Sequence, residues 1–222
     1  MSFYEFFLQS LPKLMVGMKI TLEMTVLSLI FAIILGMVSC FFKISRFKIL
    51  NAISNVYLSV IRGTPLIVQA FFLYFGVTSA LHFKIAAFTA SVIVLSLNAG
   101  AYLSEIFRSG IMAVNKGQME AARSLGLPYG VAMRKVILPQ AIRIVAPSVL
   151  NQFIITLKDT AILSAIGVGE LMKSGTLIVA RTFRSFEIYG IIAAMYFIMI
   201  MVLTYLSKIV ERRLANDKGK SN

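Results

Sequence analysis

Five polar or ionisable residues stand inside or beside long apolar stretches of this 222-residue chain. Asn98, Tyr102 and Glu105 recur at positions i, i+4 and i+7, so a helix would place them on one face. Lys158 and Asp159 set a cation beside an anion within another apolar stretch. Such a pair could hold the carboxylate and the ammonium group of a zwitterion. We therefore take these five residues as candidate substrate-binding residues.

A simpler interpretation of the same residues stays open. Lys158 and Asp159 could pair with side chains of neighbouring helices, and Glu105 could form an interfacial pair with Arg108 at the end of its helix. An ionisable group inside a membrane is unfavourable unless it is paired or faces water. Both interpretations meet that condition, so the sequence leaves the choice between them open.

A further set of candidates lies in the stretch RGTPLIVQ, which runs from Arg62 to Gln69. Arg62, Thr64 and Gln69 are polar residues in apolar surroundings, and a spacing of seven residues separates the first from the last. Gly63 and Pro65 should break or kink a helix there and free backbone groups to line a cavity. The three polar residues are candidate cavity-lining residues, with simple packing as the alternative.

The stretch from Glu120 to Pro139 reads EAARSLGLPYGVAMRKVILP and differs from its apolar surroundings in its charges and glycines. Good helix formers run up to Gly126, and the Leu-Pro pair that follows should stop the helix. A second short helix should begin near Tyr129 and lead toward Pro139. We therefore expect two short helices set at an angle.

The first of these two helices should present an apolar face beside exposed charges. The face comprises Met119, Ala122 and Leu125, and the charges are Glu120 and Arg123. A compact lobe of this kind is suited to docking in a groove of a soluble partner. An ordinary amphipathic segment beside the membrane is the alternative.

The composition indicates the surroundings in which the chain folds. Hydrophobic residues make up 59% of it and charged residues 14%, and the mean hydropathy is +0.86. These values are typical of an integral membrane protein. The formal charge of +13 does not indicate nucleic-acid binding, because the basic residues flank apolar stretches. Cys40 is the only cysteine, so an internal disulfide is excluded, and neither it nor the lone His82 indicates a metal site.

Five apolar stretches are long enough to cross a membrane, since about 20 helical residues span about 30 Å of hydrocarbon. They are Met24–Phe42, Gly63–Leu81, Ile85–Ser104, Ile144–Gly169 and Ile188–Ser207. Spans of this length are too long for the strands of a barrel. We therefore expect an all-α fold, a polytopic membrane helix bundle with five transmembrane helices.

Two smaller features refine this bundle. Residues 1–18 form a candidate interfacial segment, because apolar side chains recur at roughly helical spacing from Phe3 onward. A simple extension of the first span is the alternative. Close contact between helices is expected at the small residues Gly36, Gly100, Ala101 and Gly190.

Counts of Lys and Arg orient the spans, because the richer set of loops faces the cytosol. One set comprises Lys43, Arg46, Lys48, Arg108, Lys116, Arg123, Arg134, Lys135, Arg143, Lys208, Arg212, Arg213, Lys218 and Lys220. The other set comprises Lys13, Lys19, Lys84, Lys173, Arg181 and Arg184. We therefore expect the N-terminus outside, the C-terminus inside, and a cytoplasmic loop, residues 112–133, between the third and fourth spans.

The cytoplasmic loop carries the pattern Glu-Ala-Ala, three residues, Gly, nine residues, an aliphatic residue, any residue, and Leu-Pro. The matching residues are Glu120, Ala121, Ala122, Gly126, Val136, Leu138 and Pro139. This pattern resembles the EAA loop of bacterial ABC importer permeases, with Val136 where that family usually has Ile. The stretches RGTPLIVQAFFLYFG, AYLSEIFRSGI and KDTAILSAIGVGEL resemble the polar amino-acid branch, the histidine and glutamine permease type. The resemblance covers about residues 13 to 212.

The resemblance implies that residues 1–222 form a single ABC transporter transmembrane domain in the bacterial cell (inner) membrane. The loop would be a coupling helix, with Glu120, Ala121, Ala122, Arg123 and Gly126 as ATPase-coupling residues. The implied partners are a second copy or a paralogue of the permease, two cytosolic ATP-binding subunits, an extracellular or periplasmic substrate-binding protein, an amino-acid substrate and membrane lipid. This chain is expected to be no enzyme and to bind no cofactor, because it contains no P-loop string. ATP and Mg would belong to the partner ATPase.

The expected function is that of the transmembrane permease subunit of an ATP-driven amino-acid importer that works by alternating access. Asp159 and Glu105 favour a basic amino acid, such as arginine, lysine or histidine. Glutamine or another polar amino acid is the alternative. An ATP-independent secondary transporter is a further alternative, although five spans without an inverted repeat are few for such a carrier.

Overall fold

The fold is helical throughout the part of the chain that the structure describes, which confirms the all-α prediction. This computed structural model describes residues 2–216. The elements are α1 (Phe3–Ile44), α2 (Lys48–Gly63), α3 (Leu66–Phe71), η1 (Phe72–Val77), α4 (Thr78–Ala80), α5 (Ala87–Ala113), α6 (Lys116–Ser124), α7 (Tyr129–Ala132), η2 (Met133–Ile137), α8 (Leu138–Asp159), η3 (Thr160–Ile166), α9 (Leu171–Thr182) and α10 (Ser185–Asn216). η1 and η2 are π-helical turns, and η3 is a 3₁₀ helix. Lys218 and Lys220, used above to predict the orientation, lie outside the described residues.

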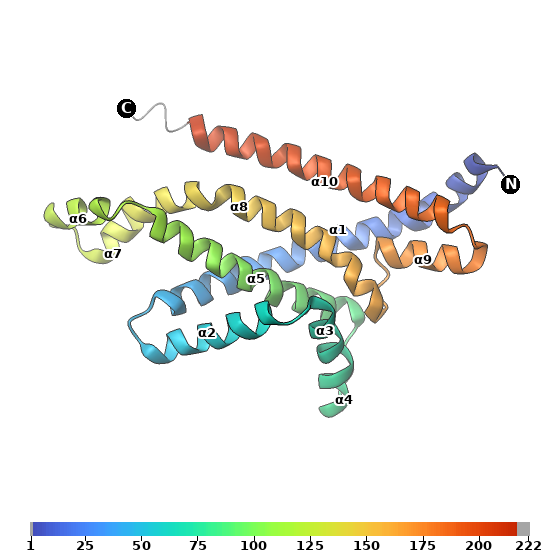
Figure 1. The fold of residues 1–222 in the computed structure, drawn as a ribbon, viewed down its shortest axis with the longest axis horizontal. Helices are drawn as coiled ribbons and strands as arrows, with labels where there is room; N and C mark the ends of the chain where they lie inside the picture. The colour runs from blue at the N-terminus through green and yellow to red at the C-terminus, as the bar shows by residue number, and fades with distance from the viewer. Residues whose placement is uncertain (1, 217–222) are drawn as a thin grey trace.

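The long helices form a bundle around α1. α1 runs along most of the molecule, α5 lies along it, α8 lies beside α5, and α10 lies on the outer side of α8 (Figure 1). Leu14, Leu157, Leu171 and Ile188 join α1, α8, α9 and α10 in one buried apolar cluster. Each of these four side chains is 0% exposed. Burial of apolar side chains therefore ties the N-terminal helix to the C-terminal half of the chain.

Four helical stretches are long and apolar enough to cross a membrane, and a bent pair makes a fifth if it is counted as one span. The four are Phe3–Ile44, Ala87–Ala113, Tyr129–Ile166 and Ser185–Arg212, and the pair is Lys48–Gly63 with Leu66–Ala80. The structure therefore supports four to five spans, a range that includes the predicted five.

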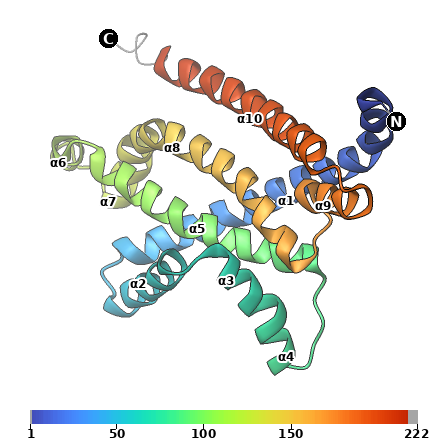
Figure 2. The ribbon, with the colours of Figure 1, turned by 45° about the vertical axis from the view of Figure 1, so that its right-hand side comes forward.

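The first span and residues 3–18 belong to one continuous helix. α1 begins after Ser2, whose side chain accepts a hydrogen bond from the Glu5 N–H while Glu5 Oε2 accepts one from the Ser2 N–H, 2.9 Å away. Its 42 residues exceed the roughly 20 that cross a bilayer. Pro12 lies inside the helix, and Figure 2 shows the first turns set at an angle to the rest. That these turns lie along the membrane surface stays a prediction.

The second predicted span, Gly63–Leu81, is the latter part of a bent pair of helices. α2 ends at Gly63, helix resumes at Leu66, and the two parts meet at 107°. Thr64 between them is extended, and Pro65 has no N–H for a continuing helix. The break predicted from Gly63 and Pro65 is confirmed.

The fourth span begins earlier than its predicted range, Ile144–Gly169. α7, η2, α8 and η3 follow one another as one helical stretch from Tyr129 to Ile166. A separate short helix from Tyr129 to Pro139 is therefore wrong, because those residues form the first turns of the span. Pro139 is tolerated there because it lies in the first turn of α8, directly after the π-helical turn.

Two predicted close helix contacts at glycine are confirmed. A Cβ on Gly36 would lie 2.9 Å from Leu103 Cβ, so α1 and α5 cross with almost no space between them. A Cβ on Gly100 would lie 3.0 Å from the Tyr57 hydroxyl. α5 is thus held closely on one side by α1 and on another by α2.

Loops rich in basic residues gather at one end of the bundle. Figure 1 shows α6, α7, the connection between α1 and α2, and the last turns of α10 at the same end. The N-terminus and α9 lie at the opposite end. The grouping agrees with the predicted orientation, and which side of the membrane this end faces stays a prediction.

Gly17 offers a test of the packing between α1 and α9. A Cβ there would lie 2.9 Å from Leu171 Cα, which cannot move unless α9 shifts. We expect Gly17→Ala to lower the free energy of unfolding by about 1–3 kcal/mol, measured as a lower thermal unfolding midpoint in detergent.

Gly190→Ala is the matched control for this substitution. A Cβ on Gly190 would meet no described atom within 4 Å, so the close contact predicted for Gly190 is wrong within the described chain. Its midpoint should stay the same or rise, because Ala favours helix over Gly. Equal midpoints for the two variants would contradict close packing at Gly17.

Candidate functional site

The predicted coupling helix is α6, and both of its ends are fixed by hydrogen bonds. Asn115 Oδ1 accepts a hydrogen bond from the Gly117 N–H at 2.8 Å. At the other end the Gly126 N–H donates to the Arg123 carbonyl at 3.0 Å, and the Leu127 N–H donates to the Ala122 carbonyl at 3.1 Å. Gly126 has φ +80°, so this end is a Schellman motif that requires a left-handed residue. The helix stop predicted after Gly126 is confirmed.

Only part of the apolar face predicted for α6 is buried in the structure. Ala122 is buried, and Met119 packs on a cluster that contains Ile137. Leu125 is instead 83% exposed, because it follows the last helical residue and leaves the predicted face. The outer surface of the lobe therefore combines the exposed Leu125 with the charges of Glu120 and Arg123.

The polar stripe of α5 meets a positive charge from α2. Asn98 is buried, Tyr102 is 39% exposed, and the guanidinium of Arg62 lies over the Tyr102 ring, 5.4 Å from its centroid. Arg108 Nη2 lies 3.0 Å from Glu105 Oε2, so the pair proposed as the simpler interpretation of Glu105 is present.

Arg62 and Glu105 share a polar hollow of about 550 Å³ between α1, α2 and α5. Its charged and polar lining comprises Lys43, Asn55, Ser59, Arg62 and Glu105. Groups of both signs therefore face one space, which suits a molecule that carries both charges.

Thr64 and Gln69 hold the break between α2 and α3. Gln69 Nε2 donates to the Ile61 carbonyl at 2.7 Å and to the Thr64 carbonyl at 3.0 Å. Thr64 Oγ1 donates to the Val60 carbonyl at 2.8 Å. Arg62 and Gln69 therefore do not share a helical face as their spacing suggested, because the chain bends between them.

Lys158 and Asp159 lie at the junction of α8 and η3 and not midway through a helix, since α8 ends at Asp159. Lys158 is exposed and Asp159 is half-buried. Neither side chain forms an ion pair with any residue whose side chain the structure describes. Their charges thus stay available to an outside group.

The packing of α5 against α8 determines where Asn98 lies along the bundle relative to Lys158 and Asp159. The two helices run antiparallel (Figure 1) and cross closely where a Cβ on Gly110 would meet Val145. Asn98 lies twelve residues before Gly110, and Lys158 lies thirteen residues after Val145. Asn98 is therefore at about the level of Lys158 and Asp159.

The candidate residues consequently form two levels along α5. Glu105 lies seven residues beyond Asn98, which is about 10 Å nearer the end that carries α6. We call the level that holds Asn98, Lys158 and Asp159 the upper level. The lower level, nearer α6, holds Glu105 and Arg62.

Glu170 is a buried carboxylate that the sequence reasoning missed. It is 0% exposed, and its oxygens accept hydrogen bonds from the Met172 N–H at 2.8 Å, the Lys173 N–H at 2.6 Å and the Tyr196 hydroxyl at 2.9 Å. Burial raises the pKa of Glu170, and these hydrogen bonds oppose the shift. The carboxylate caps α9, a position where Ser, Thr, Asp or Asn is the usual signal.

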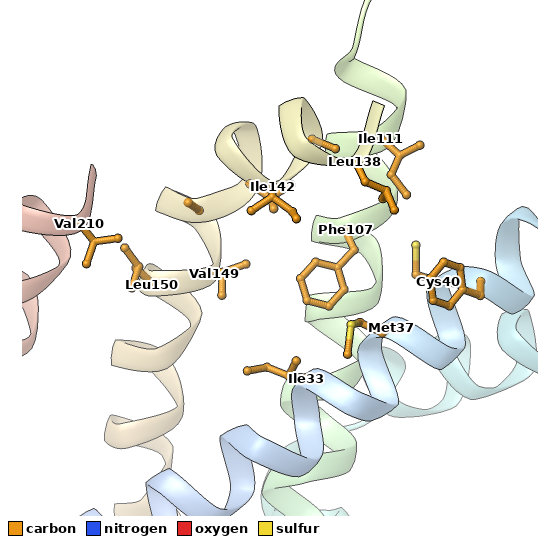
Figure 3. Close-up of a pocket in the computed structure, with 14 residues that line it drawn as sticks. Ile33, Met37, Cys40, Phe107, Ile111, Leu138, Ile142, Val149, Leu150 and Val210 are labelled. Carbon is orange, nitrogen blue, oxygen red and sulfur yellow. The ribbon is translucent and has the colours of Figure 1, made fainter. Parts of the chain in front are cut away.

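A second hollow, of about 430 Å³, lies between α1, α5, α8 and α10. Figure 3 shows its lining, which includes Met37, Cys40, Phe107, Ile142 and Val149. The lining consists of hydrocarbon and sulfur side chains. It cannot replace the hydration of a charged amino acid, so it is no candidate for the substrate site.

Known proteins match this sequence over nearly its whole length. Residues 28–216 match the family described as "Binding-protein-dependent transport system inner membrane component". The chain is 42% identical over 207 residues to the arginine transport system permease protein ArtQ of Bacillus subtilis (strain 168), with coverage of 93% of this chain and 94% of that protein. It is 39% identical over 206 residues to the glutamine transport system permease protein GlnP of Escherichia coli (strain K12), with coverage of 92% and 94%.

The chain belongs to the polar amino-acid ABC transporter permeases. A solved structure agrees: "Crystal structure of an amino acid ABC transporter with histidines" superimposes with a TM-score of 0.91 and 41% identity, covering 96% of this chain and 99% of that chain. This permease is a multi-pass inner-membrane protein and a non-catalytic subunit of an amino-acid importer. Membership in the family implies ATPase and binding-protein partners, and it does not support the alternative of an ATP-independent carrier.

Gln69 provides a test of how the bent pair is held. Replacing it by Leu removes the donor shared by two backbone carbonyls, which should cost about 1–2 kcal/mol locally. We expect faster amide hydrogen exchange in residues 60–70, measured by mass spectrometry. Val68→Leu on the same helix is the control, because Val68 is 51% exposed. Equal exchange in the two variants would show that Gln69 does not hold the bend.

Proposed function

We propose that this permease moves a cationic amino acid, such as arginine, lysine or histidine, across the membrane by alternating access. The observation that carries the proposal is the half-buried Asp159 carboxylate, which has no ion-pair partner among the described side chains. A carboxylate at membrane depth is unfavourable unless it is paired or faces water, and a cationic substrate would supply the partner. The similarity to an arginine permease supports the same class.

The upper level can bind both ends of an amino acid. Lys158 can hold the α-carboxylate and Asp159 an ammonium or guanidinium group, while the amide of Asn98 supplies hydrogen bonds. Bidentate pairing with a carboxylate would favour a guanidinium. The α-amino and α-carboxylate groups of the substrate and a cationic side chain would all be recognised by groups of the upper level.

The lower level would receive the substrate nearer the α6 end. Arg62 and Glu105 line the polar hollow there, and Tyr102 lies between the two levels on α5. A substrate that leaves Asp159 would then meet the Arg62 guanidinium and the Glu105 carboxylate, which pairs with Arg108. Thr64 and Gln69 contribute by holding the bend beside this hollow.

Movement would come from outside the chain through the α6 lobe. Glu120, Ala121, Ala122, Arg123 and Gly126 form a lobe that would seat in a groove of a cytosolic ATPase subunit. Two such subunits, with their own ATP and Mg, would drive a pair of permeases made of this chain and a copy or a paralogue. A binding protein outside would deliver the amino acid, and the closed ATPase pair would favour the state that accepts it.

A second candidate substrate is glutamine, because a glutamine permease is 39% identical to this chain. A neutral side chain would leave Asp159 to the α-ammonium group alone. The two candidates therefore differ in how strongly uptake depends on the charge of Asp159.

Asp159→Asn tests this dependence, because Asn keeps the size of the side chain and removes its charge. We expect uptake of labelled arginine into proteoliposomes with the ATPase and binding protein to fall about tenfold or more, since a charge-assisted bond is lost. Glu23→Gln is the control, because Glu23 is exposed and, among the described side chains, forms an ion pair with Lys19 alone. Full arginine uptake by the Asp159→Asn protein would remove the cationic preference.

Gly126→Ala tests the coupling role of α6. Its φ of +80° is unfavourable for Ala by about 1–2 kcal/mol, so the end of the lobe should distort. We expect ATP hydrolysis to continue while amino-acid uptake per ATP falls, with membrane insertion unchanged.

Gly130→Ala is the matched control on the same lobe. Its Cβ would meet no described atom within 4 Å, and its φ is not positive. Uptake per ATP should stay at the level of the unmodified protein. If Gly126→Ala also left this ratio unchanged, α6 would not transmit the motion.

A further inference from the structure

A buried polar network joins α1, α9 and α10 near the end of α8. Glu170 precedes α9, and the Tyr196 hydroxyl of α10 donates to its Oε2 at 2.9 Å. The Leu171 N–H donates to Thr21 Oγ1 of α1 at 3.1 Å. Tyr196 also packs on the buried apolar cluster that contains Leu14, Leu157, Leu171 and Ile188. Tyr196 is thus tied to the start of α9 by its hydroxyl and to α1 and α8 by this cluster.

The network lies in a closely packed region. Thr21, Thr160 and Glu170 are each 0% exposed. A Cβ on Gly17 of α1 would lie 2.9 Å from the backbone of α9, and a Cβ on Gly175 of α9 would lie 3.2 Å from Ile188 of α10. α9 therefore has little freedom to shift between α1 and α10.

Thr160 directly follows Asp159, the residue assigned to substrate recognition. Its Oγ1 donates to the Leu157 carbonyl at 2.7 Å, which fixes the point where α8 passes into η3. Leu157 directly precedes Lys158 and belongs to the buried cluster on which Tyr196 packs, so a change at Tyr196 would reach the junction through Leu157.

We propose that Glu170 and Tyr196 are positioning residues of the substrate site, which hold the α8–η3 junction so that Lys158 and Asp159 meet the amino acid in one fixed geometry. The proposal rests on the role of Asp159 given above. Neither Glu170 nor Tyr196 touches the substrate. They act through the buried cluster that contains Leu157 and through the close packing of α9.

A buried carboxylate suits this role better than an apolar residue would. Apolar side chains pack without a strict direction, whereas each hydrogen bond of Glu170 fixes an angle and a partner. Two of its bonds go to the N-terminus of α9, where the helix dipole favours a negative charge. The third goes to α10, so the carboxylate sets the position of one helix against the other.

Tyr196→Phe is the principal test, because it removes one hydroxyl and keeps the ring. It is made in the full complex of permease and ATPase in nanodiscs, and the probes are labelled L-arginine and L-glutamine. We expect about tenfold weaker equilibrium binding of whichever probe the unmodified complex binds, the loss typical of one hydrogen bond to a charged group. Amide exchange in residues 158–166 should become faster.

Two further variants separate positioning from general stability. Tyr205→Phe on the same helix is the control, because Tyr205 is 67% exposed, and it should change neither binding nor exchange. Glu170→Gln keeps the shape of the side chain and removes its charge, so it should weaken binding in the same direction and to a smaller extent. It also serves as the test if Tyr196→Phe does not assemble.

Combination with Asp159→Asn decides whether the network acts through Asp159. If it does, Tyr196→Phe should cause no further loss of binding in the Asp159→Asn background. Losses that simply add, or normal binding by Tyr196→Phe together with faster exchange, would overturn the proposal and leave the substrate role of Asp159 intact. Normal binding by Asp159→Asn alone would overturn that substrate role and this inference with it.

Discussion

Hydrocarbon offers no hydrogen bonds, so a membrane-spanning chain can interrupt its helices only where the protein itself satisfies the freed backbone groups. This permease meets that constraint with single side chains. Gln69 donates to the carbonyls of Ile61 and Thr64 where α2 and α3 meet at 107°. Glu170 accepts from two backbone N–H groups at the start of α9. At each interruption a side chain of the protein therefore satisfies the freed backbone groups. The long helices between the interruptions can remain regular and apolar.

Part of the polar chemistry of the chain lies beside such interruptions, whereas Asn98, Tyr102 and Glu105 lie on the unbroken helix α5. Arg62 comes just before the bend at α2, and Lys158 and Asp159 come where α8 changes into η3. Discontinuous membrane helices are a general way to bring charge to a substrate within a bilayer. The apolar hollow near Phe107 shows the contrast, since regular helix faces enclose it and only hydrocarbon and sulfur groups line it.

Local signals predicted the parts of the fold that depend on local chemistry. The stop of α6 at Gly126 and the break at Pro65 follow from backbone preferences that any neighbour would leave unchanged. Long-range packing determined the rest. Glu170 accepts a hydrogen bond from the Tyr196 hydroxyl, 26 residues away, and Met119 of α6 packs on a cluster that contains Ile137 of the fourth span. No sequence spacing encodes such contacts, so hydropathy gave the spans but missed the buried network and the bend angle.

The join between α5 and α6 supports the proposed link between the α6 lobe and the proposed substrate site. Only Val114 and Asn115 separate the two helices; Val114 is buried in a cluster with Ile137, and Asn115 caps α6. A flexible linker would absorb a displacement of α6, whereas this short, packed join passes it to α5 and to the first turns of the α8 span. Asn98 lies on α5 and Asp159 ends α8, so under the proposed mechanism a force applied at α6 would act on both helices. Nucleotide-driven movement would then change the distance between the Asn98 amide and the Asp159 carboxylate.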